Sequence, residues 1–205
     1  MGRKSLKEVR RQEIVKAFYK TAKKEGLHNT SIAKIAEVMD VNPSLILHYF
    51  KDKNDLILAL IDYILDRYQK IYVIAKKEKP IDELKGVIDN LFSRKWNSLI
   101  SDDVYYNCYT LIFRNQEIRR KYKALHDELR ASLEKRLTDC MEEGEIYIEN
   151  PNLTASLIYT FLEGAYYYLC MEKDRTKQAL AMEQYKAHIY QMLGLALPAV
   201  AAAEN

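Results

Sequence analysis

Hydrophobic positions recur at helical spacing along almost the whole chain. In residues 7–25, for example, Ile14, Ala17, Phe18 and Ala22 fall three or four residues apart, which places them on one face of a helix. Strand-like alternation is almost absent, and the chain has only 6 glycines and 4 prolines. The pattern predicts an all-α protein of about nine helices. The longer ones are expected at about 7–25, 53–77, 81–99, 104–114, 117–143, 151–172 and 176–196.

Residues 30–56 carry the densest set of local signals. Thr30 or Ser31 is suited to cap a short helix, and a turn at 40–41 separates it from a second short helix. Asn42 caps that second helix, and Pro43 occupies its first turn, where a missing N–H is not needed. This arrangement predicts a helix-turn-helix, the unit that lays a short helix in the major groove of DNA.

The second short helix divides into a core face and an outward face. Ile46, Tyr49 and Phe50 follow i, i+3, i+4 spacing and form the core face. Outward leucines fit thymine methyl groups better than water, and outward serine and histidine can hydrogen-bond to bases or phosphates. The alternative is three packed helices with His48 as an ordinary surface residue. The candidate DNA-binding residues are Thr30, Asn42, Ser44, Leu45, Leu47, His48, Tyr49 and Lys53.

Positive charge is concentrated in the N-terminal part of the chain, as DNA binding requires. The chain as a whole carries a net charge of +3, but residues 1–53 hold 12 Lys and Arg against 6 Asp and Glu. The basic excess therefore coincides with the predicted helix-turn-helix and favours a polyanionic partner. The same feature leaves open a basic helical module that binds a membrane surface or a protein partner without reading DNA.

Residues 30–56 resemble the signature of TetR-family one-component repressors. That signature reads Ile-Ala-x-x-x-Gly-Val-Ser, then a variable stretch, then Tyr-x-Tyr/His-Phe-x-x-Lys-x-x-Leu. The motif resemblance covers about residues 7–56, and the architecture resembles the family over the whole chain. The matching positions are Ile35, Ala36, Val41, His48, Tyr49, Phe50, Lys53 and Leu56.

Two positions depart from the family signature. Asp40 stands where the family usually has glycine, and aspartate enters the left-handed region at some cost. Leu47 stands where the family usually has a tyrosine that contacts a phosphate, so this contact is not expected here.

The resemblance implies a helical body that dimerises and holds a small-molecule pocket. The expected organisation is a DNA-binding domain at 1–53, a ligand-binding and dimerisation domain at 54–198, and a flexible tail at 199–205. The fourth helix is expected to join the three-helix head to this body.

The helix at 151–172 is apolar around most of its circumference, so it must be covered on several sides. Gly164 lies in the middle of this helix, where glycine costs roughly 1 kcal/mol relative to alanine. The close approach of another helix would explain why glycine stands at this position. Together with the last helix, at 176–196, this helix is the candidate for a four-helix dimer interface. The alternative is that both helices are only intrachain core. The candidate interface residues are Leu157, Phe161, Gly164, Ile189 and Leu193.

Tyrosine is abundant, with 16 residues that cluster along the chain. Aromatic rings with a polar edge suit a cavity for a partly polar ligand, although stripes at helical spacing also arise simply as core. The candidate ligand-binding residues are Trp96, Tyr106, Tyr109, Phe113, Tyr159, Glu163 and Tyr167.

Glu163 is the most specific of these candidates. A carboxylate within an apolar helix is expected to meet a base such as Arg94 or Arg114, or a cationic ligand. The pair Glu163-Gly164 and the stretch from Trp96 to Tyr122 also resemble the subgroup that contains choline-responsive repressors. The resulting hypothesis is an effector that is an organic cation or an amphipathic compound.

The function expected is a sequence-specific DNA-binding regulator, most simply a homodimeric repressor that a small molecule releases from a palindromic operator. No catalytic set, phosphate-binding glycine loop or metal-ligand spacing is present, so neither an enzyme, a cofactor nor a metal is expected. Three widely spaced cysteines fit the cytoplasm. No apolar run reaches 18 residues, so no transmembrane helix is expected, and a DNA-binding regulator is expected to have no membrane partner.

Overall fold

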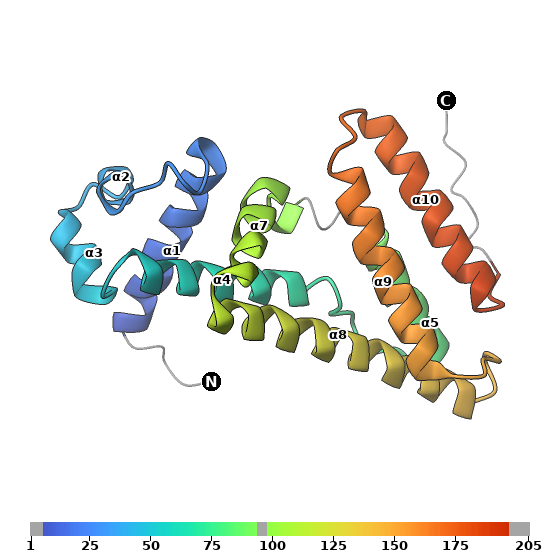
Figure 1. Cartoon of the computed structure of the whole chain (residues 1–205). Helices are drawn as coiled ribbons and strands as arrows, with labels where there is room; N and C mark the ends of the chain where they lie inside the picture. The colour runs from blue at the N-terminus through green and yellow to red at the C-terminus, as the bar shows by residue number, and fades with distance from the viewer. Residues whose placement is uncertain (1–5, 94–97, 197–205) are drawn as a thin grey trace. The chain divides into compact units, whose positions relative to one another are not determined.

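The computed structural model describes residues 6–93 and 98–196, and most of these residues are helical (Figure 1). The described residues form nine α-helices and one 3-10 helix, with no strand among them, which confirms the all-α prediction. The helices are α1 (Leu6–Glu25), α2 (Ile32–Val38), α3 (Pro43–Tyr49), α4 (Lys53–Gln69), α5 (Pro80–Leu91), α7 (Asp102–Tyr109), η1 (Thr110–Phe113), α8 (Gln116–Glu142), α9 (Pro151–Leu169) and α10 (Arg175–Met192).

Two helices end earlier than their hydrophobic patterns predict. Helix α4 ends at Gln69 rather than near residue 77, and α5 ends at Leu91 rather than near residue 99. The residues after α4 are rich in β-branched side chains, which lower helix propensity. Ile71 and Tyr72 are nonetheless buried, with 3% and 4% of their surfaces exposed. Apolar spacing in this region therefore reflects burial of a non-helical segment.

The final helix also stops short of its predicted end. Helix α10 ends at Met192 rather than near residue 196, and Gly194 adopts a φ of +67° just beyond it. A glycine in the left-handed region is a common way to close a helix, so the signal that ends α10 is Gly194. Pro198, a residue type that can also end a helix, lies outside the described residues.

The chain divides into two compact units. The first contains the described parts of Met1–Lys70 and Asn97–Leu125, and the second contains those of Ile71–Trp96 and His126–Asn205. The functional boundary near residue 53 remains a prediction.

The core of the first unit joins α1 to the short helices and to α4. Helix α1 contacts α2, α3, α4 and α7, while α2 packs on α3. The side chains of this core are completely or almost completely buried, so the positions of the short helices are set by tertiary packing. They include Ile14, Phe18, Ile35, Ala36, Ile46, Phe50, Leu56 and Leu60.

In the second unit, α9 and α10 lie side by side (Figure 1). Phe161 of α9 lies 6.4 Å from Phe92 and 5.4 Å from Tyr185 of α10, measured between ring centroids. Glu145 accepts a hydrogen bond of 2.7 Å from the backbone N–H of Ile81 in the first turn of α5. Within the described ranges, no helix is both long enough and apolar enough to cross a membrane.

Candidate nucleic-acid interface and polar cluster

The first short helix begins where the sequence allowed two caps. Ser31 is the N-cap of α2, and its hydroxyl accepts a hydrogen bond of 3.2 Å from the backbone N–H of Lys34. This bond satisfies one of the N–H groups that lack partners in a first helical turn. The open choice between Thr30 and Ser31 is therefore resolved in favour of Ser31.

The turn between α2 and α3 depends on one residue in an unusual conformation. Asp40 has a φ of +52°, and no other non-glycine residue in the described ranges has a positive φ. The next N–H, that of Val41, donates to the carbonyl of Ala36 at 3.0 Å. This six-to-one bond is the mark of a Schellman ending, in which the reversed residue is usually glycine. Asp40 thus occupies the left-handed region, as expected from its place in the motif.

Helix α3 is fixed from its first residue by a side-chain cap. The Asn42 side chain accepts a hydrogen bond of 2.9 Å from the backbone N–H of Ser44 and one of 2.8 Å from its hydroxyl. Ile46 and Phe50 then anchor the helix, since neither has any exposed surface. The cap and the core face predicted from the sequence are confirmed, except that Tyr49 is only half-buried.

The opposite face of α3 is open to solvent. Leu47 is 49% exposed, and Ser44 and His48 are also exposed, while Leu45 is half-buried. The rings of His48 and Tyr49 meet edge to face, with centroids 5.1 Å apart. An exposed leucine between polar side chains gives this face both apolar and hydrogen-bonding contacts for base edges. Contact with DNA by these residues remains a prediction.

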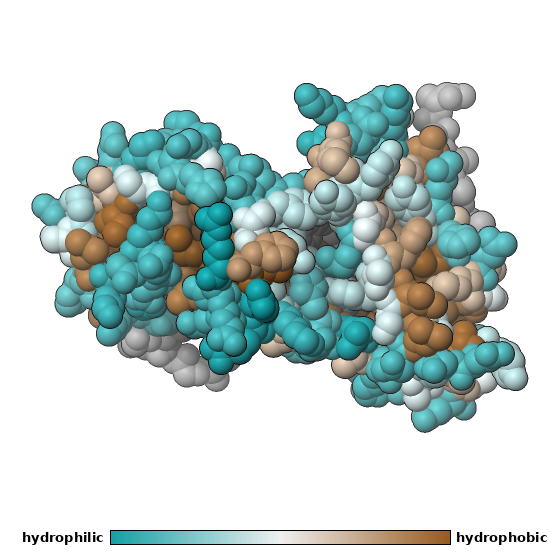
Figure 2. All heavy atoms as spheres, viewed as in Figure 1, coloured by the Kyte–Doolittle hydropathy of each residue, from teal (hydrophilic) through white to brown (hydrophobic). Residues whose placement is uncertain are grey.

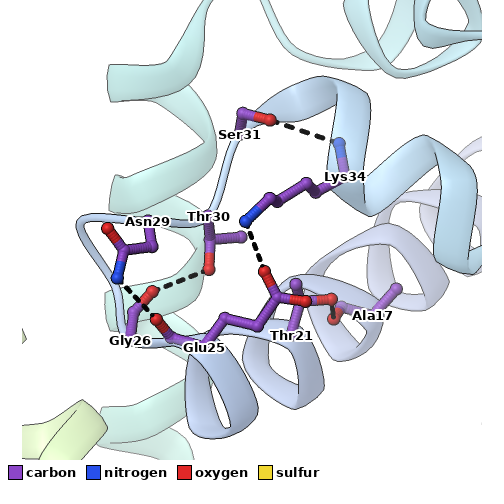
Figure 3. Close-up of polar contacts among 8 residues, drawn as sticks. All are labelled: Ala17, Thr21, Glu25, Gly26, Asn29, Thr30, Ser31 and Lys34. Atoms are coloured by element: carbon purple, nitrogen blue, oxygen red, sulfur yellow. Dashed lines mark hydrogen bonds and ion pairs between the residues drawn. The ribbon is translucent and has the colours of Figure 1, made fainter.

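Thr30 does not have the surface position that a phosphate contact requires. It is completely buried, and its hydroxyl donates a hydrogen bond of 2.9 Å to the carbonyl of Gly26 (Figure 3). Beside it, the Lys34 ammonium pairs with the Glu25 carboxylate at 2.5 Å, which lowers the pKa of that carboxyl group. Thr30 is therefore a brace between α1 and α2, and its predicted DNA contact is wrong.

The start of α4 is capped by two aspartates. Asp52 accepts a hydrogen bond of 2.9 Å from the N–H of Asp55, and Asp55 accepts one of 3.1 Å from the N–H of Lys51. Lys53, the first residue of the helix, is half-buried beside these groups. Lys53 keeps its place as a candidate phosphate contact.

Arg11 is a residue of this surface that the hydrophobic pattern alone did not identify. Its guanidinium group donates a hydrogen bond to the carbonyl of Tyr49, the last residue of α3. It also lies over the Phe50 ring, with 4.1 Å between the guanidinium carbon and the ring centroid. A sequence signal existed, because Arg11 precedes Ile14 and Val15 by three and four residues on the buried face of α1.

The candidate ligand-binding tyrosines are divided between the two units. A tyrosine cluster in the first unit contains Tyr68, Tyr105, Tyr106, Tyr109 and Tyr122. The ring of Tyr105 stacks on that of Tyr68, with centroids 5.8 Å apart, and on that of Tyr109, with centroids 6.2 Å apart. These rings therefore pack against one another. Tyr159, Glu163 and Tyr167 belong to the second unit.

Three of the ligand-binding candidates are not enclosed or not described. Phe113 is 73% exposed and Tyr167 is 61% exposed. Neither residue therefore lines a closed cavity, although the sequence predicted that both would. Phe113 lies in a short 3-10 helix after α7, and Tyr167 faces away from the buried side of α9. Trp96 lies outside the described residues.

Glu163 lies in a polar cluster that consists of Tyr72, His126, Tyr159, Glu163 and Tyr166. Burial lowers the pKa of His126, whereas the Glu163 carboxylate acts in the opposite direction. Burial, with a further contribution from Glu163, raises the pKa of Tyr72 well above its usual range. The carboxylate therefore influences two deeply placed groups of the second unit, His126 and Tyr72. Arg94 is outside the described residues.

Hydrogen bonds hold the rest of the polar cluster. Nδ1 of His126 and the hydroxyl of Tyr159 form a hydrogen bond, and their rings meet edge to face at 5.7 Å. The hydroxyl of Tyr166 donates to the carbonyl of Leu91 at 2.6 Å, which ties α9 to the end of α5. In the described ranges, no three His, Cys, Asp or Glu residues are grouped to hold a metal ion.

The predicted dimer residues divide between surface and core. Leu157 is 54% exposed and Phe161 is 36% exposed. Gly164 is also exposed, and a Cβ added there would meet no side chain within 4 Å. Ile189 and Leu193 are each only 2% exposed. These two residues pack inside the protomer, so their predicted place in an interface is wrong.

Two family models match this chain, one in its N-terminal part and one over its C-terminal part. The model for bacterial regulatory proteins of the tetR family matches residues 14–60, which include α2 and α3. The model described as the tetracyclin repressor-like C-terminal domain matches residues 79–195, more than half of the chain. The chain belongs to the TetR family.

Curated relatives and solved structures agree with membership of the TetR family. The HTH-type transcriptional regulator BetI of Stenotrophomonas maltophilia is 24% identical over 136 residues, which are 65% of this chain and 69% of the relative. BetI of Pseudomonas fluorescens is 37% identical over 97 residues, 45% of this chain, and the match spans about half (49%) of the relative's length. A TetR transcription regulator from Haloarcula marismortui has the same fold, with a TM-score of 0.78, 17% identity and coverage of 91% of this chain and 97% of the other.

Family membership determines the class of function. The TetR-family chain is a DNA-binding transcriptional regulator with no enzymatic role, and the alternative of a basic module without DNA readout is not favoured. The exposed face of α3 is the candidate for the surface that contacts DNA.

Proposed function

We propose that the protein is a homodimeric repressor that binds a palindromic operator and is released from it by a small cationic effector. The observation that carries the proposal is the exposed face of α3, held on a turn with the Asn42 cap and the buried anchors Ile46 and Phe50. Ser44, Leu45, Leu47 and His48 are the residues proposed to read base edges. Such a protein acts on DNA in the cytoplasm.

An apolar stripe on α9 supports the homodimer. Leu153, Leu157, Phe161, Gly164 and Tyr168 follow one another at spacings of three or four residues. Each is exposed, and the leucines are each 54% exposed. Figure 2 shows hydrophobic side chains gathered over α9 and α10. An exposed apolar patch of this kind marks an interaction site, and Gly164 leaves space for a close helix from a second copy.

Two-fold symmetry gives the proposal a geometric consequence. A dimer presents two copies of α3, and each reads one half-site. Helix-turn-helix dimers read half-sites about one helical turn apart, roughly 34–36 Å. The operator should therefore be an inverted repeat.

The polar cluster supports a cationic effector. Glu163 is half-buried and supplies negative charge, while Tyr72, Tyr159 and Tyr166 supply aromatic faces. Aromatic faces attract cations, and a carboxylate adds a direct electrostatic contact. The neutral state that burial favours for His126 adds no positive charge against such a ligand.

The effector acts by preferring the form of the dimer whose two reading helices are wrongly spaced. A tenfold loss of operator affinity requires a preference of about 1.4 kcal/mol for that form. No covalent step is involved, so removal of the effector restores operator binding.

Footprinting on a selected operator tests the dimer and the palindrome together. Two symmetric half-sites should be protected, and Leu157→Glu should abolish this pattern at concentrations where the wild type is fully bound. Protection of a single asymmetric half-site that Leu157→Glu leaves unchanged would refute the proposal. Ser156→Glu, on the same helix beside Leu157, is the matched control for added charge.

Calorimetric titration tests the effector. Choline and other quaternary amines should release heat on binding, and Glu163→Gln should abolish that heat while the protein remains folded. Tight binding of a fatty acyl compound, with no heat from any cation, would contradict the cationic class.

A further inference from the structure

The C-terminal end of the recognition helix α3 is held by a residue of α1. Tyr49 ends α3, and its carbonyl accepts a hydrogen bond from the Arg11 guanidinium group. The same group lies 4.1 Å from the centroid of Phe50, the C-cap of α3, whose ring is fully buried. A cation at a helix C-terminus interacts favourably with the helix dipole and with carbonyls that lack partners inside the helix.

We infer that Arg11 is a positioning residue that sets the angle of α3 and thereby the sequence specificity of DNA binding. The inference rests on the proposed function, since it assigns a role within the same reading surface. Arg11 acts through α3 and makes no contact with DNA itself.

The short length of α3 makes its angle sensitive to this anchor. A helix of seven residues is about 10 Å long, so a tilt of about 10° moves its far end by roughly 2 Å. A displacement of this size breaks hydrogen bonds to base edges, because their lengths vary by only a few tenths of an ångström. Isolated helices of this length are unstable, so the angle of α3 depends on its tertiary contacts.

The surroundings of Arg11 argue against a direct phosphate contact. Arg11 is half-buried in a groove of about 610 Å³ between α1 and α4. The groove is lined by three carboxylates, Glu8, Asp62 and Asp66, and by three further bases, Lys16, Arg67 and Lys70. These opposite charges largely offset one another, so the groove is not a strongly positive site for a phosphate. The guanidinium group is already directed at the Tyr49 carbonyl and the Phe50 ring.

Arg10 provides a matched control on the same helix. Its guanidinium group pairs with Glu13 at 2.7 Å, and its side chain is 43% exposed. Arg10→Met and Arg11→Met each remove one positive charge from α1. Only Arg11→Met removes the anchor of α3.

The test measures dissociation constants for the selected operator and for a scrambled duplex of equal length, across a series of salt concentrations. Arg11→Met should weaken operator binding at least tenfold and scrambled binding less than twofold. The slope of log K against log salt should stay as in the wild type, because no phosphate contact is lost. Arg10→Met should keep the ratio of the two affinities.

The variants Arg11→Lys and Arg11→Gln show whether Arg11→Met acts by removing the anchor of α3 or only by removing a positive charge. Both retain an N–H donor for the Tyr49 carbonyl, so both should recover part of the affinity ratio, although glutamine is neutral. They also decide the question if Arg11→Met does not fold, which the melting temperature reports. Failure of both to exceed the ratio of a folded Arg11→Ala variant would overturn the inference.

Three other results bear on the inference. Equal weakening on both duplexes, with the slope reduced by about 0.9, would make Arg11 an ordinary phosphate contact and overturn it. If the folded Arg11→Met variant kept the wild-type affinity ratio, the positioning role of Arg11 would be refuted, while the proposed function would stand. A wild type that selects no operator would refute the proposed function, and this inference with it.

Discussion

Asp40 is the residue of the α2–α3 turn at which a single substitution should increase stability. Its φ of +52° lies in the left-handed region, and the Val41-to-Ala36 hydrogen bond fixes the backbone there. Asp40 is exposed, so its replacement leaves no cavity. Asp40→Gly therefore changes mainly the cost of the backbone conformation.

The magnitude follows from two opposing effects. The left-handed conformation costs an L-residue roughly 1–2 kcal/mol, and aspartate lies toward the lower end because its side chain can hydrogen-bond locally. Glycine increases the conformational entropy of the unfolded chain, which offsets roughly 0.4–1 kcal/mol. The expected net gain is about 0.5–1 kcal/mol, or a rise in melting temperature of about 1–4 °C for a chain of this size.

The assay is urea unfolding followed by circular dichroism, with thermal melting as a second measure. Asp40→Gly should raise the urea midpoint without changing the slope of the transition. Glu37→Gly is the matched control, because Glu37 is exposed in α2, where glycine should cost about 1 kcal/mol. Asp40→Ala should leave the strain in place and give no gain.

Two results would refute this reasoning. If Asp40→Gly lowered stability as Glu37→Gly does, the Asp40 side chain would have to contribute more than its backbone conformation costs. If Asp40→Ala stabilised as much as Asp40→Gly, the positive φ would not be the source of the effect.

Three further predictions concern the second unit. Leu157→Glu should shift sedimentation from dimer to monomer, because it places charge in the exposed apolar stripe of α9, and an unchanged dimer would show that this stripe is not the interface. Burial lowers the pKa of His126 below 6.5, so the unfolded chain binds a proton at pH values where the folded protein does not, and stability should fall as the pH drops below about 6.5. His126→Gln should flatten that fall in urea unfolding at pH 5 to 7, and an equally steep fall would contradict this assignment. Glu163→Gln should abolish the heat of quaternary amine binding without lowering the melting temperature, and an unchanged titration would place the cation elsewhere.

Local signals predicted the α2–α3 turn and the start of α3 well because each signal depends on neighbouring residues. The Asn42 cap, Pro43 in the first turn of α3 and the left-handed Asp40 are decided within a few residues of the chain. The buried face of Ile46 and Phe50 follows from helical spacing alone.

Features that depend on distant residues were harder to predict. The end of α4 at Gln69 could not be read from apolar spacing, because Ile71 and Tyr72 remain buried outside any helix. Periodicity likewise cannot distinguish a face that packs within the protomer from one that meets a second copy, and Ile189 proved to be of the first kind. The contact of Arg11 with Tyr49 spans 38 residues of sequence.

Selection from random duplexes, followed by affinity measurements at several salt concentrations, tests the central claim most directly. The account predicts that an inverted repeat is enriched, and that log K falls steeply and linearly as log salt rises. Weak binding without sequence preference would contradict the account, because the exposed face of α3 would then not read base edges.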